Sequence, residues 1–439
     1  MARSLEVPRA ARSVAVVGSG WAGIAAAVEA TRAGANVTLM DMAAQPGGRA
    51  RSVEARGVAL DNGQHIMIGA YVDTLALMRT VGVDPAQAFL RAPLRFTDPQ
   101  GAGLRLGAGR PIPAFVSAVL RQRGWSLRER LALLRAAAGW AARRFRCDPA
   151  STVAELTARL PTRVREQLVE PLCVAALNTA AADASGAVFL RVLRDALFSG
   201  PGSADLLLPR EGLSDLLPNP AARWLIGAGA QLQLAHRVES IASFDGGWHV
   251  DGKRFDAVIL ATPPSQAAQL TAAAAPGWSR TAAGLAYEPI ITVYLQCEGA
   301  QLPEAMLALH ADDESPAQFV FDRGQLGGPH GLLAFVISGA GAWVDRGASA
   351  TARATGQQAR AVLSHWLPKA PQLLQTIIEK RATFRCTPGL ERPPMQIAPG
   401  LRAAGDYVAG PYPATLEGAV RSGLAAAREG APAARPSGA

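Results

Sequence analysis

The stretch that decides the fold is SVAVVGSGWAGIAAAVEATRAGANVTLMD, residues 13–41. It begins with a short β-branched run and turns at GSGWAG (18–23). It continues as an alanine-rich segment that Gly34 ends, and closes with a second apolar run at 37–40. Because alanine favours helices and β-branched residues favour strands, the predicted order is strand, tight turn, helix, strand. This pattern predicts a βαβ unit, in which a right-handed crossover joins two parallel strands.

The glycines of this turn predict a dinucleotide site. In the GxGxxG spacing, the first glycine permits the turn, the second lets a pyrophosphate approach the backbone, and the third allows close helix packing. The N-terminus of the helix directs N–H groups at the phosphate. Asp41 ends the second strand, 23 positions after Gly18, where a carboxylate accepts the ribose hydroxyls and disfavours NADP. The residues expected to bind the nucleotide here are Gly18, Gly20, Trp21, Ala22, Gly23 and Asp41.

Four further motifs resemble those of the flavin amine-oxidase superfamily, which includes phytoene desaturases, protoporphyrinogen oxidases and monoamine oxidases. QPGGR (45–49) follows the acidic end of the second strand, and DNGQH (61–65) follows another short strand. Near the other end of the chain, AGD (404–406) and ATLEGA (414–419) have the form of the superfamily's closing motif, with a strand expected after the first and a helix after Thr415. The resemblance implies that the cofactor is FAD.

This resemblance also implies a flavin site assembled from the two ends of the chain. In the superfamily, the GGR segment runs along the pyrophosphate and the D-x-G segment lies near the isoalloxazine ring. The closing acid binds the ribitol or pyrophosphate, and the last helix directs N–H groups at the flavin O2. The segment matching Val238 meets the adenine, although a strand valine is more often core. The residues implied for FAD are Gly48, Arg49, Gly63, Gln64, Val238, Gly405, Asp406, Leu416 and Glu417.

The order of elements predicts an α/β protein of two interleaved domains. A Rossmann-type FAD-binding domain with a parallel sheet is expected beside a mixed α+β substrate domain, in the two-domain architecture of amine oxidases. The FAD-binding domain is expected to comprise residues 1–88, 205–265 and 393–430, the substrate domain 89–204 and 266–392, and a disordered tail 431–439. Strands are expected at 231–241, 290–296, 332–338 and 407–409.

Five longer stretches resemble a narrower family, the hydroxysqualene dehydroxylases of bacterial hopanoid synthesis, also called squalene-associated FAD-dependent desaturases. They are DNGQHIMIGAY (61–71), EPLCVAALNT (170–179), LLLPREGLSDLLP (206–218), YEPIITVYL (287–295) and YPATLEGAVRSG (412–423). The resemblance implies reductive removal of a hydroxyl from hydroxysqualene, giving squalene and water. The C–O bond ionises to an allylic cation, a proton reaches the leaving oxygen, and hydride from N5 of reduced FAD quenches the cation. An enclosed apolar pocket keeps water from the cation.

That chemistry requires an acid near the substrate hydroxyl. Asp61, His65 and Glu417 are the titratable groups that the resemblance implies nearest the ring. A hydrogen-bonded scaffold for the loop is an equal alternative for Asp61 and His65, and Tyr287 or Glu288 could also donate. No second nucleotide fingerprint accompanies the first, so an external electron donor is expected to supply the reducing equivalents.

A basic stretch predicts contact with a membrane surface. Residues 121–146, RQRGWSLRERLALLRAAAGWAARRFR, carry eight arginines against one glutamate, and Trp125, Trp140 and Phe145 flank leucines at helical spacing. A basic amphipathic helix with interfacial aromatic residues is typical of peripheral membrane binding. A core-packed helix with a solvated basic face is the alternative. Nucleic acid is not an expected partner, because no recognition motif accompanies the formal net charge of +9.

Other features exclude several classes of protein. The four cysteines form no CxxC pair and the six histidines form no HExxH or HxH pair, so no metal site is expected. Residues 1–13 are polar and no apolar run reaches eighteen residues, so neither a signal peptide nor a transmembrane helix is expected. The expected location is cytoplasmic and peripheral to the inner face of the cell membrane.

Two alternatives to the dehydroxylase remain open. The first is an FAD-dependent desaturase or oxidase of a carotenoid, a porphyrinogen or an amine. The second is a non-catalytic escort protein that shares the architecture and binds prenylated partners. The acid at Asp41, the GGR motif and the complete closing motif favour true flavin binding over the escort.

Overall fold

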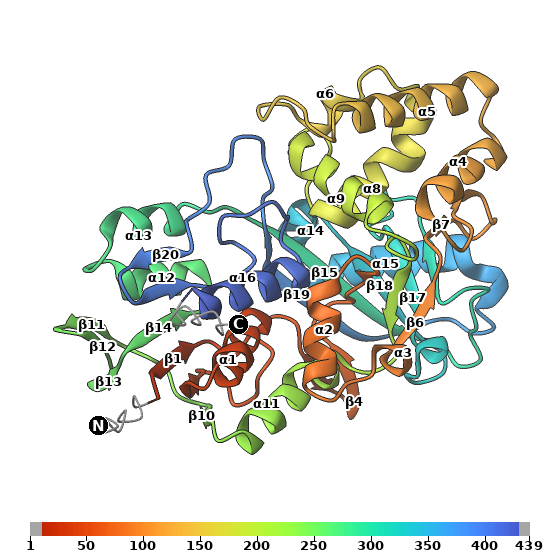
Figure 1. The fold of residues 1–439 in the computed structure, drawn as a ribbon. Helices are drawn as coiled ribbons and strands as arrows, with labels where there is room; N and C mark the ends of the chain where they lie inside the picture. Colours follow the sequence, from red (N-terminus) through yellow and green to blue (C-terminus); the bar gives the residue numbers. More distant parts are fainter. Residues whose placement is uncertain (1–10, 430–439) are drawn as a thin grey trace, which may run out of the picture.

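The computed structural model describes residues 11–429 of the 439-residue chain (Figure 1). The predicted disordered tail, 431–439, lies outside the described residues. A six-stranded sheet has the order β10-β2-β1-β14-β21-β20. Its neighbours are parallel, except that β20 runs antiparallel to β21. The strands are β1 (Ser13–Val17), β2 (Asn36–Met40), β10 (Gln231–Gln233), β14 (Ala257–Leu260), β20 (Gln396–Ala398) and β21 (Leu401–Ala403).

The predicted βαβ unit is confirmed. β1 and β2 are parallel neighbours, and α1 (Trp21–Arg32) connects them and ends just before Gly34, whose φ is +84°. Val16 of β1 pairs with Leu39 on one side and Ile259 on the other, and all three side chains are buried. A strand buried on both faces reads as a continuous apolar run, which is why this segment was readable from sequence.

A second, antiparallel sheet lies beside the first (Figure 1). Its order is β16-β17-β18-β15-β19, so the long strand β15 pairs with both β18 and β19. The strands predicted at 290–296 and 332–338 are confirmed as β15 and β18. The five strands are β15 (Tyr287–Gln296), β16 (Met306–Ala308), β17 (Phe319–Asp322), β18 (Leu332–Ile337) and β19 (Gln372–Phe384).

Smaller sheets and helices complete the fold. The short strands are β3 (Ser52–Ala55), β4 (Val58–Asp61), β5 (Met67–Ile68), β6 (Phe89–Ala92), β7 (Arg95–Thr97), β8 (Gly103–Arg105), β9 (Leu206–Pro209), β11 (Ile241–Phe244), β12 (Gly247–Val250) and β13 (Lys253–Phe255). The helices α4 to α9 gather at the end of the molecule away from β1 (Figure 1). They are α4 (Pro111–Arg121), α5 (Leu127–Ala142), α6 (Val153–Thr157), α7 (Thr162–Val164), α8 (Glu170–Leu177) and α9 (Gly186–Phe198). The others are α2 (Val72–Thr80), α3 (Pro85–Ala88), α10 (Leu213–Leu216), α11 (Pro218–Gly227), α12 (Pro264–Thr271), α13 (Pro276–Ala283), α14 (Gly341–Arg346), α15 (Ala348–Leu363) and α16 (Leu416–Arg428).

Two predicted strands are wrong in part or whole. Residues 407–409 form no strand, because the chain turns after β21 and the N–H of Val408 bonds to the carbonyl of Gly405 at 3.3 Å. The AGD motif therefore follows a strand and does not precede one. The strand predicted over 231–241 ends at Gln233, since Ala235 adopts a positive φ of +54° and its N–H bonds to the carbonyl of Ala43.

The basic stretch at 121–146 is not one amphipathic helix. α4 ends at Arg121, Gly124 adopts a φ of +85°, and α5 begins at Leu127. Trp125 and Trp140 are only 4% and 6% exposed, so they belong to the core and do not form an interfacial belt. Periodicity predicted their helical spacing but could not decide which face packs inward.

The two ends of the chain meet where α16 packs against α1. Gly423 of α16 makes this approach possible, because a Cβ there would lie 2.0 Å from the carbonyl oxygen of Ala22 and 3.0 Å from Cβ of Ala25. No side chain larger than hydrogen fits such a crossing. The middle of α16 is thereby held against the N-terminal half of α1.

Candidate flavin and substrate site

One cavity of about 670 Å³ is lined by residues from both ends of the chain. Helices α4, α5, α8 and α9 and the antiparallel sheet supply most of the remaining lining, which is largely apolar. The predicted site residues that line the cavity are Gly20, Trp21, Ala22, Arg49, Gly63, Gln64, His65, Gly405, Asp406, Leu416 and Glu417. The predicted residues that do not line it are Gly18, Gly23, Asp41, Gly48, Asp61 and Val238.

The three glycines of the turn have different surroundings. Gly18 has a φ of +106°, and a Cβ there would lie 2.5 Å from the carbonyl oxygen of Ala261. A Cβ on Gly23 would lie 1.8 Å from the carbonyl oxygen of Gly18. In contrast, the nearest atom to a Cβ on Gly20 is Cα of Gly48, at 4.0 Å. Packing therefore requires glycine at positions 18 and 23, whereas position 20 presents bare backbone to the cavity.

Asp41 holds the glycine turn against the end of β2. Its Oδ2 accepts hydrogen bonds from the N–H and the hydroxyl of Ser19, at 2.5 and 2.7 Å, and its Oδ1 accepts one from the N–H of Ala43 at 2.8 Å. A carboxylate with these three partners orients the turn. Its predicted bonds to the ribose hydroxyls stay a prediction.

Arg49 joins the two ends of the chain. Its Nη2 donates to both carboxylate oxygens of Asp406, at 2.7 and 2.8 Å, and its Nη1 donates to the carbonyl of Ala382 at 2.6 Å. Burial by itself would lower the pKa of Arg49, but the Asp406 carboxylate raises it above its ordinary value. The GGR motif and the closing GD motif are therefore in direct contact, and both line the cavity.

The DNGQH segment begins at Asp61, the last residue of β4, and turns at Gly63, whose φ is +88°. Asp61 faces away from the cavity: its Oδ1 accepts from the hydroxyl of Ser52 and the N–H of Leu213, both at 2.8 Å. Arg323 lies 3.7 Å from its other oxygen. These contacts fit a scaffold for the loop, the alternative that sequence reasoning left open, and the predicted catalytic role of Asp61 stays untested.

His65 is a predicted catalytic residue that lines the cavity. Its ring makes fewer hydrogen bonds to the protein than the carboxylates of Asp61 and Glu417 do. Its Nδ1 lies 3.0 Å from the carbonyl oxygen of Gly63, so this nitrogen carries the proton in the neutral ring. Burial lowers the pKa of His65 below its ordinary value, and the Gly63 carbonyl opposes that shift only in part. His65 is therefore mostly neutral at neutral pH, with Nε2 as an acceptor.

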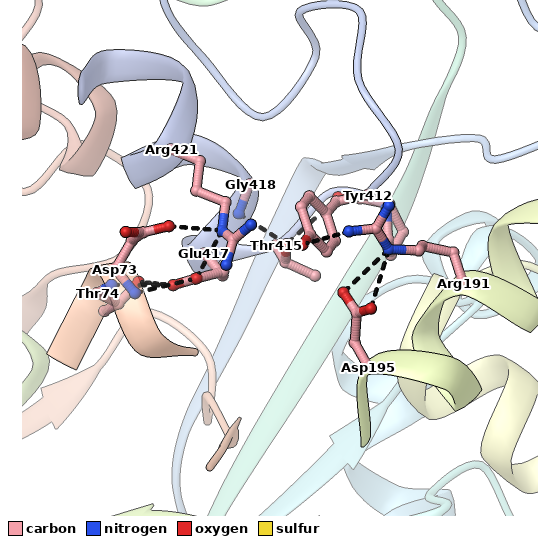
Figure 2. Close-up of polar contacts among 10 residues, drawn as sticks. Asp73, Thr74, Arg191, Asp195, Tyr412, Thr415, Glu417, Gly418 and Arg421 are labelled. Carbon is pink, nitrogen blue, oxygen red and sulfur yellow. Dashed lines mark hydrogen bonds and ion pairs between the residues drawn. The ribbon is translucent and has the colours of Figure 1, made fainter. Parts of the chain in front are cut away.

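Glu417 anchors α16 to the start of α2, as Figure 2 shows. Its Oε2 accepts from the N–H and hydroxyl of Thr74, at 2.9 and 2.6 Å, and its Oε1 accepts from the N–H of Asp73 at 3.2 Å. Arg421 donates to the same carboxylate at 2.7 Å. This set of bonds indicates a structural role for Glu417, although its predicted catalytic role stays untested.

Sequence reasoning missed a second polar cluster, which joins α9 to the segment just before α16 (Figure 2). Arg191 of α9 pairs with Asp195 at 3.0 Å and donates to the hydroxyl of Tyr412 at 2.9 Å. The guanidinium of Arg421 lies 5.0 Å from the centre of the Tyr412 ring. Asp195 and Tyr412 both line the cavity. The spacing of four between Arg191 and Asp195 was the available signal, because such residues share a helix face.

The other predicted residues do not line the cavity. Val238 is 4% exposed and belongs to the core, beside a segment whose His236 N–H bonds to the carbonyl of Asp41. Tyr287 and Glu288, the alternative donors, also lie outside the lining. Burial raises the pKa of Tyr287 to about 12 and raises that of Glu288.

Several features of the cavity lining fit a flavin dinucleotide. Four buried polar atoms that belong to lining residues have no hydrogen-bond partner within residues 11–429: Gln64 Nε2, Thr262 Oγ1, Thr292 Oγ1 and Tyr407 OH. Buried polar groups normally have partners, so these atoms fit a ligand with its own donors and acceptors. Bare backbone at Gly20 fits a pyrophosphate, and the first turn of α16 fits an acceptor on the ring. The residues present therefore fit FAD.

Neither a metal-binding cluster nor a membrane-spanning helix is found in the described part of the chain. No group of three or more His, Cys, Asp or Glu side chains in residues 11–429 is placed to hold a metal ion. Each helix in the same residues is too short or too polar to cross a bilayer.

Comparison with known proteins relates the whole chain to flavoenzymes. Residues 21–429 match the model of the flavin containing amine oxidoreductase family. The hydroxysqualene dehydroxylase of Rhodopseudomonas palustris is 30% identical over 438 residues, which cover 95% of this chain and 97% of that protein. The hydroxysqualene dehydroxylase of Sinorhizobium fredii is 28% identical over 442 residues, with the same coverage of both chains.

Solved structures show the same fold at lower identity. An oxidoreductase from Methanosarcina mazei aligns with a TM-score of 0.71 at 15% identity, covering 95% of this chain and 100% of that one. Cyclohexylamine oxidase from Brevibacterium oxydans aligns with a TM-score of 0.68 at 17% identity, covering 95% and 98%. The predicted α/β fold with a Rossmann-type domain and an amine-oxidase-like architecture is therefore confirmed.

Proposed function

This chain belongs to the family of flavin-containing amine oxidoreductases, and from that premise we propose that it is an FAD-dependent hydroxysqualene dehydroxylase. In this proposal the enzyme removes the hydroxyl of hydroxysqualene reductively and forms squalene and water. The observation that carries the proposal is the cavity itself, which extends from the residues that fit FAD into a largely apolar chamber. Three curated hydroxysqualene dehydroxylases that match nearly the full length of the chain support the same substrate.

The chain's own residues would hold the cofactor from both ends. Gly20 and the first turn of α1 would receive the pyrophosphate, and the first turn of α16, beginning at Leu416, would direct N–H groups at the ring. The Arg49–Asp406 pair would keep these two parts in register. Bound FAD, once reduced, would supply from N5 the hydride that replaces the hydroxyl.

The apolar chamber would serve the cationic stage of the reaction. Leu106, Phe115, Leu134 and Phe189 are among the side chains that line it. They offer no group that attacks a carbocation, and they exclude water that would return it to the alcohol. The same lining suits a long hydrocarbon, because burying apolar surface provides the binding free energy.

The first test is a single turnover. The enzyme is reduced anaerobically and mixed with hydroxysqualene in detergent micelles, and we expect squalene to form as the flavin absorbance returns. A Gly20→Val preparation without flavin is the matched control. If no squalene forms but a carotenoid, a porphyrinogen or an amine is turned over, the alternative of an FAD-dependent desaturase or oxidase would be supported instead. A colourless protein that cannot be reconstituted with FAD would support the escort.

We propose His65 as the group that delivers the proton to the leaving oxygen. Because burial lowers its pKa, only a small fraction is protonated at neutral pH. That fraction rises about tenfold for each unit that the pH falls until the lowered pKa is reached. Squalene formation in a single turnover should therefore accelerate as the pH falls from neutral into the acidic range.

Substitution of His65 checks this assignment. The variant His65→Gln should lose the acid-side acceleration, whereas His310→Gln, at an exposed position outside the cavity, should keep it. Stability gives a second readout with the opposite sign. The folded state with a lowered histidine pKa binds fewer protons than the unfolded state, so wild-type stability falls as pH falls and His65→Gln flattens that slope. An unchanged rate profile in His65→Gln would assign the proton to another group.

The reducing equivalents would come from outside this chain. The GxGxxG unit at residues 18–23 is the nucleotide fingerprint that the sequence contains, and it fits FAD. We therefore propose that a separate carrier or protein reduces the bound flavin. Anaerobic titration of the oxidised enzyme with candidate donors, monitored by bleaching of the flavin, tests this directly.

A further inference from the structure

Helix α4 presents an apolar stripe to the outside of the molecule. Ile112, Val116 and Leu120 are 44%, 37% and 44% exposed, and their spacing of four places them on one helix face. Leu127, at the start of α5, is 65% exposed. It lies near the end of α4, since Arg130 of α5 donates to the carbonyl of Leu120 at 2.8 Å. The four side chains extend along α4 and onto the α4–α5 link.

The stripe borders the cavity of the proposed active site. Ile112 and Val116 are exposed and also line the cavity, as does Phe198 at the end of α9, which is 47% exposed. The N–H of Gly202, just after α9, bonds to the carbonyl of Gly109, just before α4. The exposed ends of α4 and α9 therefore surround the same region of the cavity, far from the parallel sheet (Figure 1).

The charge around the stripe is strongly positive. The exposed arginines of this region are Arg110, Arg121, Arg123, Arg128, Arg135, Arg143, Arg144, Arg146 and Arg194. Within residues 11–429, none of these nine makes an ion pair with a carboxylate. Glu129 is the acid within 107–147, and its carboxylate is engaged by Ser126 in a capping box.

We propose that this face, the lipid-binding face, docks on the surface of an anionic lipid bilayer. It consists of the stripe Ile112, Val116, Leu120 and Leu127, together with Arg121, Arg123 and Arg128 beside it. Exposed aliphatic side chains enter the boundary between headgroups and acyl chains, while arginines bind the anionic headgroups. The buried Trp125 and Trp140 take no part, so the contact lies on α4 and the exposed residues of the link and not along 121–146 as a whole.

A bilayer fits this face better than a second copy of the chain. Two copies brought together here would place their unpaired arginines against each other, and like charges repel. An anionic bilayer neutralises the same arginines. It also presents hydrocarbon at the opening of an apolar cavity, so the proposed substrate would pass between lipid and cavity without crossing water. Docking itself does not depend on the proposed function, whereas this use of it does.

Vesicle binding tests the docking without any substrate. The FAD-loaded enzyme is floated with phosphatidylcholine vesicles that either contain or lack phosphatidylglycerol, at low and high salt. We expect binding to the anionic vesicles that weakens as salt rises. The triple variant Arg121→Gln, Arg123→Gln, Arg128→Gln should bind roughly a hundredfold more weakly at low salt, at about fivefold per arginine. The matched variant Arg79→Gln, Arg353→Gln, Arg360→Gln, at exposed positions on α2 and α15, should bind like the wild type.

The apolar part is tested at the two stripe residues that do not line the cavity. Leu120→Glu combined with Leu127→Glu should reduce vesicle binding about tenfold or more, because each substitution puts a charge where an aliphatic side chain would enter the bilayer. Ile226→Glu on α11, where the side chain is 61% exposed, is the control and should bind normally. The proposal would be overturned if Ile226→Glu lost as much vesicle binding as Leu120→Glu, Leu127→Glu. It would also be overturned if the wild type did not bind anionic vesicles.

Two readouts separate docking from its alternatives. Sedimentation that changes from dimer to monomer in Leu120→Glu, Leu127→Glu, with no vesicle binding by the wild type, would assign the face to a second copy and overturn the proposal. With substrate, the same variant should turn over hydroxysqualene in detergent normally and in vesicles poorly. Absence of turnover in detergent by the wild type would count against the proposed function and leave the vesicle result standing.

Discussion

Replacing Gly20 by valine is expected to abolish flavin binding while the protein still folds. A Cβ at position 20 meets no protein atom closer than 4.0 Å, so the branched side chain would project into the cavity where the pyrophosphate is proposed to lie. We expect the affinity for FAD to fall about a hundredfold or more, which corresponds to ~2.7 kcal/mol. Titration of the apoprotein with FAD, followed by flavin fluorescence, measures the loss.

Two matched glycines separate a binding defect from a folding defect. In Gly23→Val the new Cβ would lie 1.8 Å from the carbonyl oxygen of Gly18, so we expect a destabilisation of about 4 kcal/mol or more, with poor folding. At Gly227, the last residue of α11, a Cβ would meet no atom within 4 Å, and Gly227→Val should bind FAD normally. Normal FAD affinity in Gly20→Val would remove the glycine turn from the cofactor site.

Breaking the Arg49–Asp406 pair should release the flavin and weaken the contact between the two ends of the chain. Arg49→Met leaves the Asp406 carboxylate, which is 11% exposed, without the arginine that donates to both of its oxygens. Leaving such a group unpaired costs about 1–3 kcal/mol. We expect a loss of that size in the free energy of unfolding by urea, with weak or absent FAD binding.

The double variant and a surface pair complete this experiment. Arg49→Met, Asp406→Asn should cost less than the sum of the two single variants, because neither charge is then left unpaired. Lys369 and Glu298 form a pair whose side chains are 63% and 81% exposed, so Lys369→Met should change stability by about 1 kcal/mol or less. Strict additivity of the two single substitutions would show that the pair does not couple the GGR and GD motifs.

The glycine motifs were predictable because each depends on the backbone of a few consecutive residues. Gly18 and Gly63 adopt φ values of +106° and +88°, which glycine reaches without strain. The buried strand β1 was equally clear, since a strand covered on both faces is apolar throughout. Such local rules also placed β15 and β18, in which apolar and β-branched residues extend over several positions.

The basic stretch shows where local rules stop. Its composition predicted both the helical conformation and the excess of arginine, but the pattern placed Trp125 and Trp140 at an interface. Both are buried, and Trp125 donates to the side chain of Gln167, 42 positions away. The exposed stripe on α4 lies mostly before the stretch. Which face of a helix is covered depends on elements that its own sequence does not contain.

The amino-acid sequence alone was enough to establish the βαβ unit, the fingerprint for a dinucleotide and the family resemblance, because these follow from short segments with strict backbone demands. The tertiary structure was needed to separate His65 from Asp61 and Glu417. His65 and Glu417 both line the cavity, but the carboxylates of Asp61 and Glu417 accept hydrogen bonds from other parts of the chain. Asp61 meets the N–H of Leu213 across 152 positions, and Glu417 meets Thr74 across 343. Contacts over such separations arise only when the whole chain has packed, so no local pattern could reveal them.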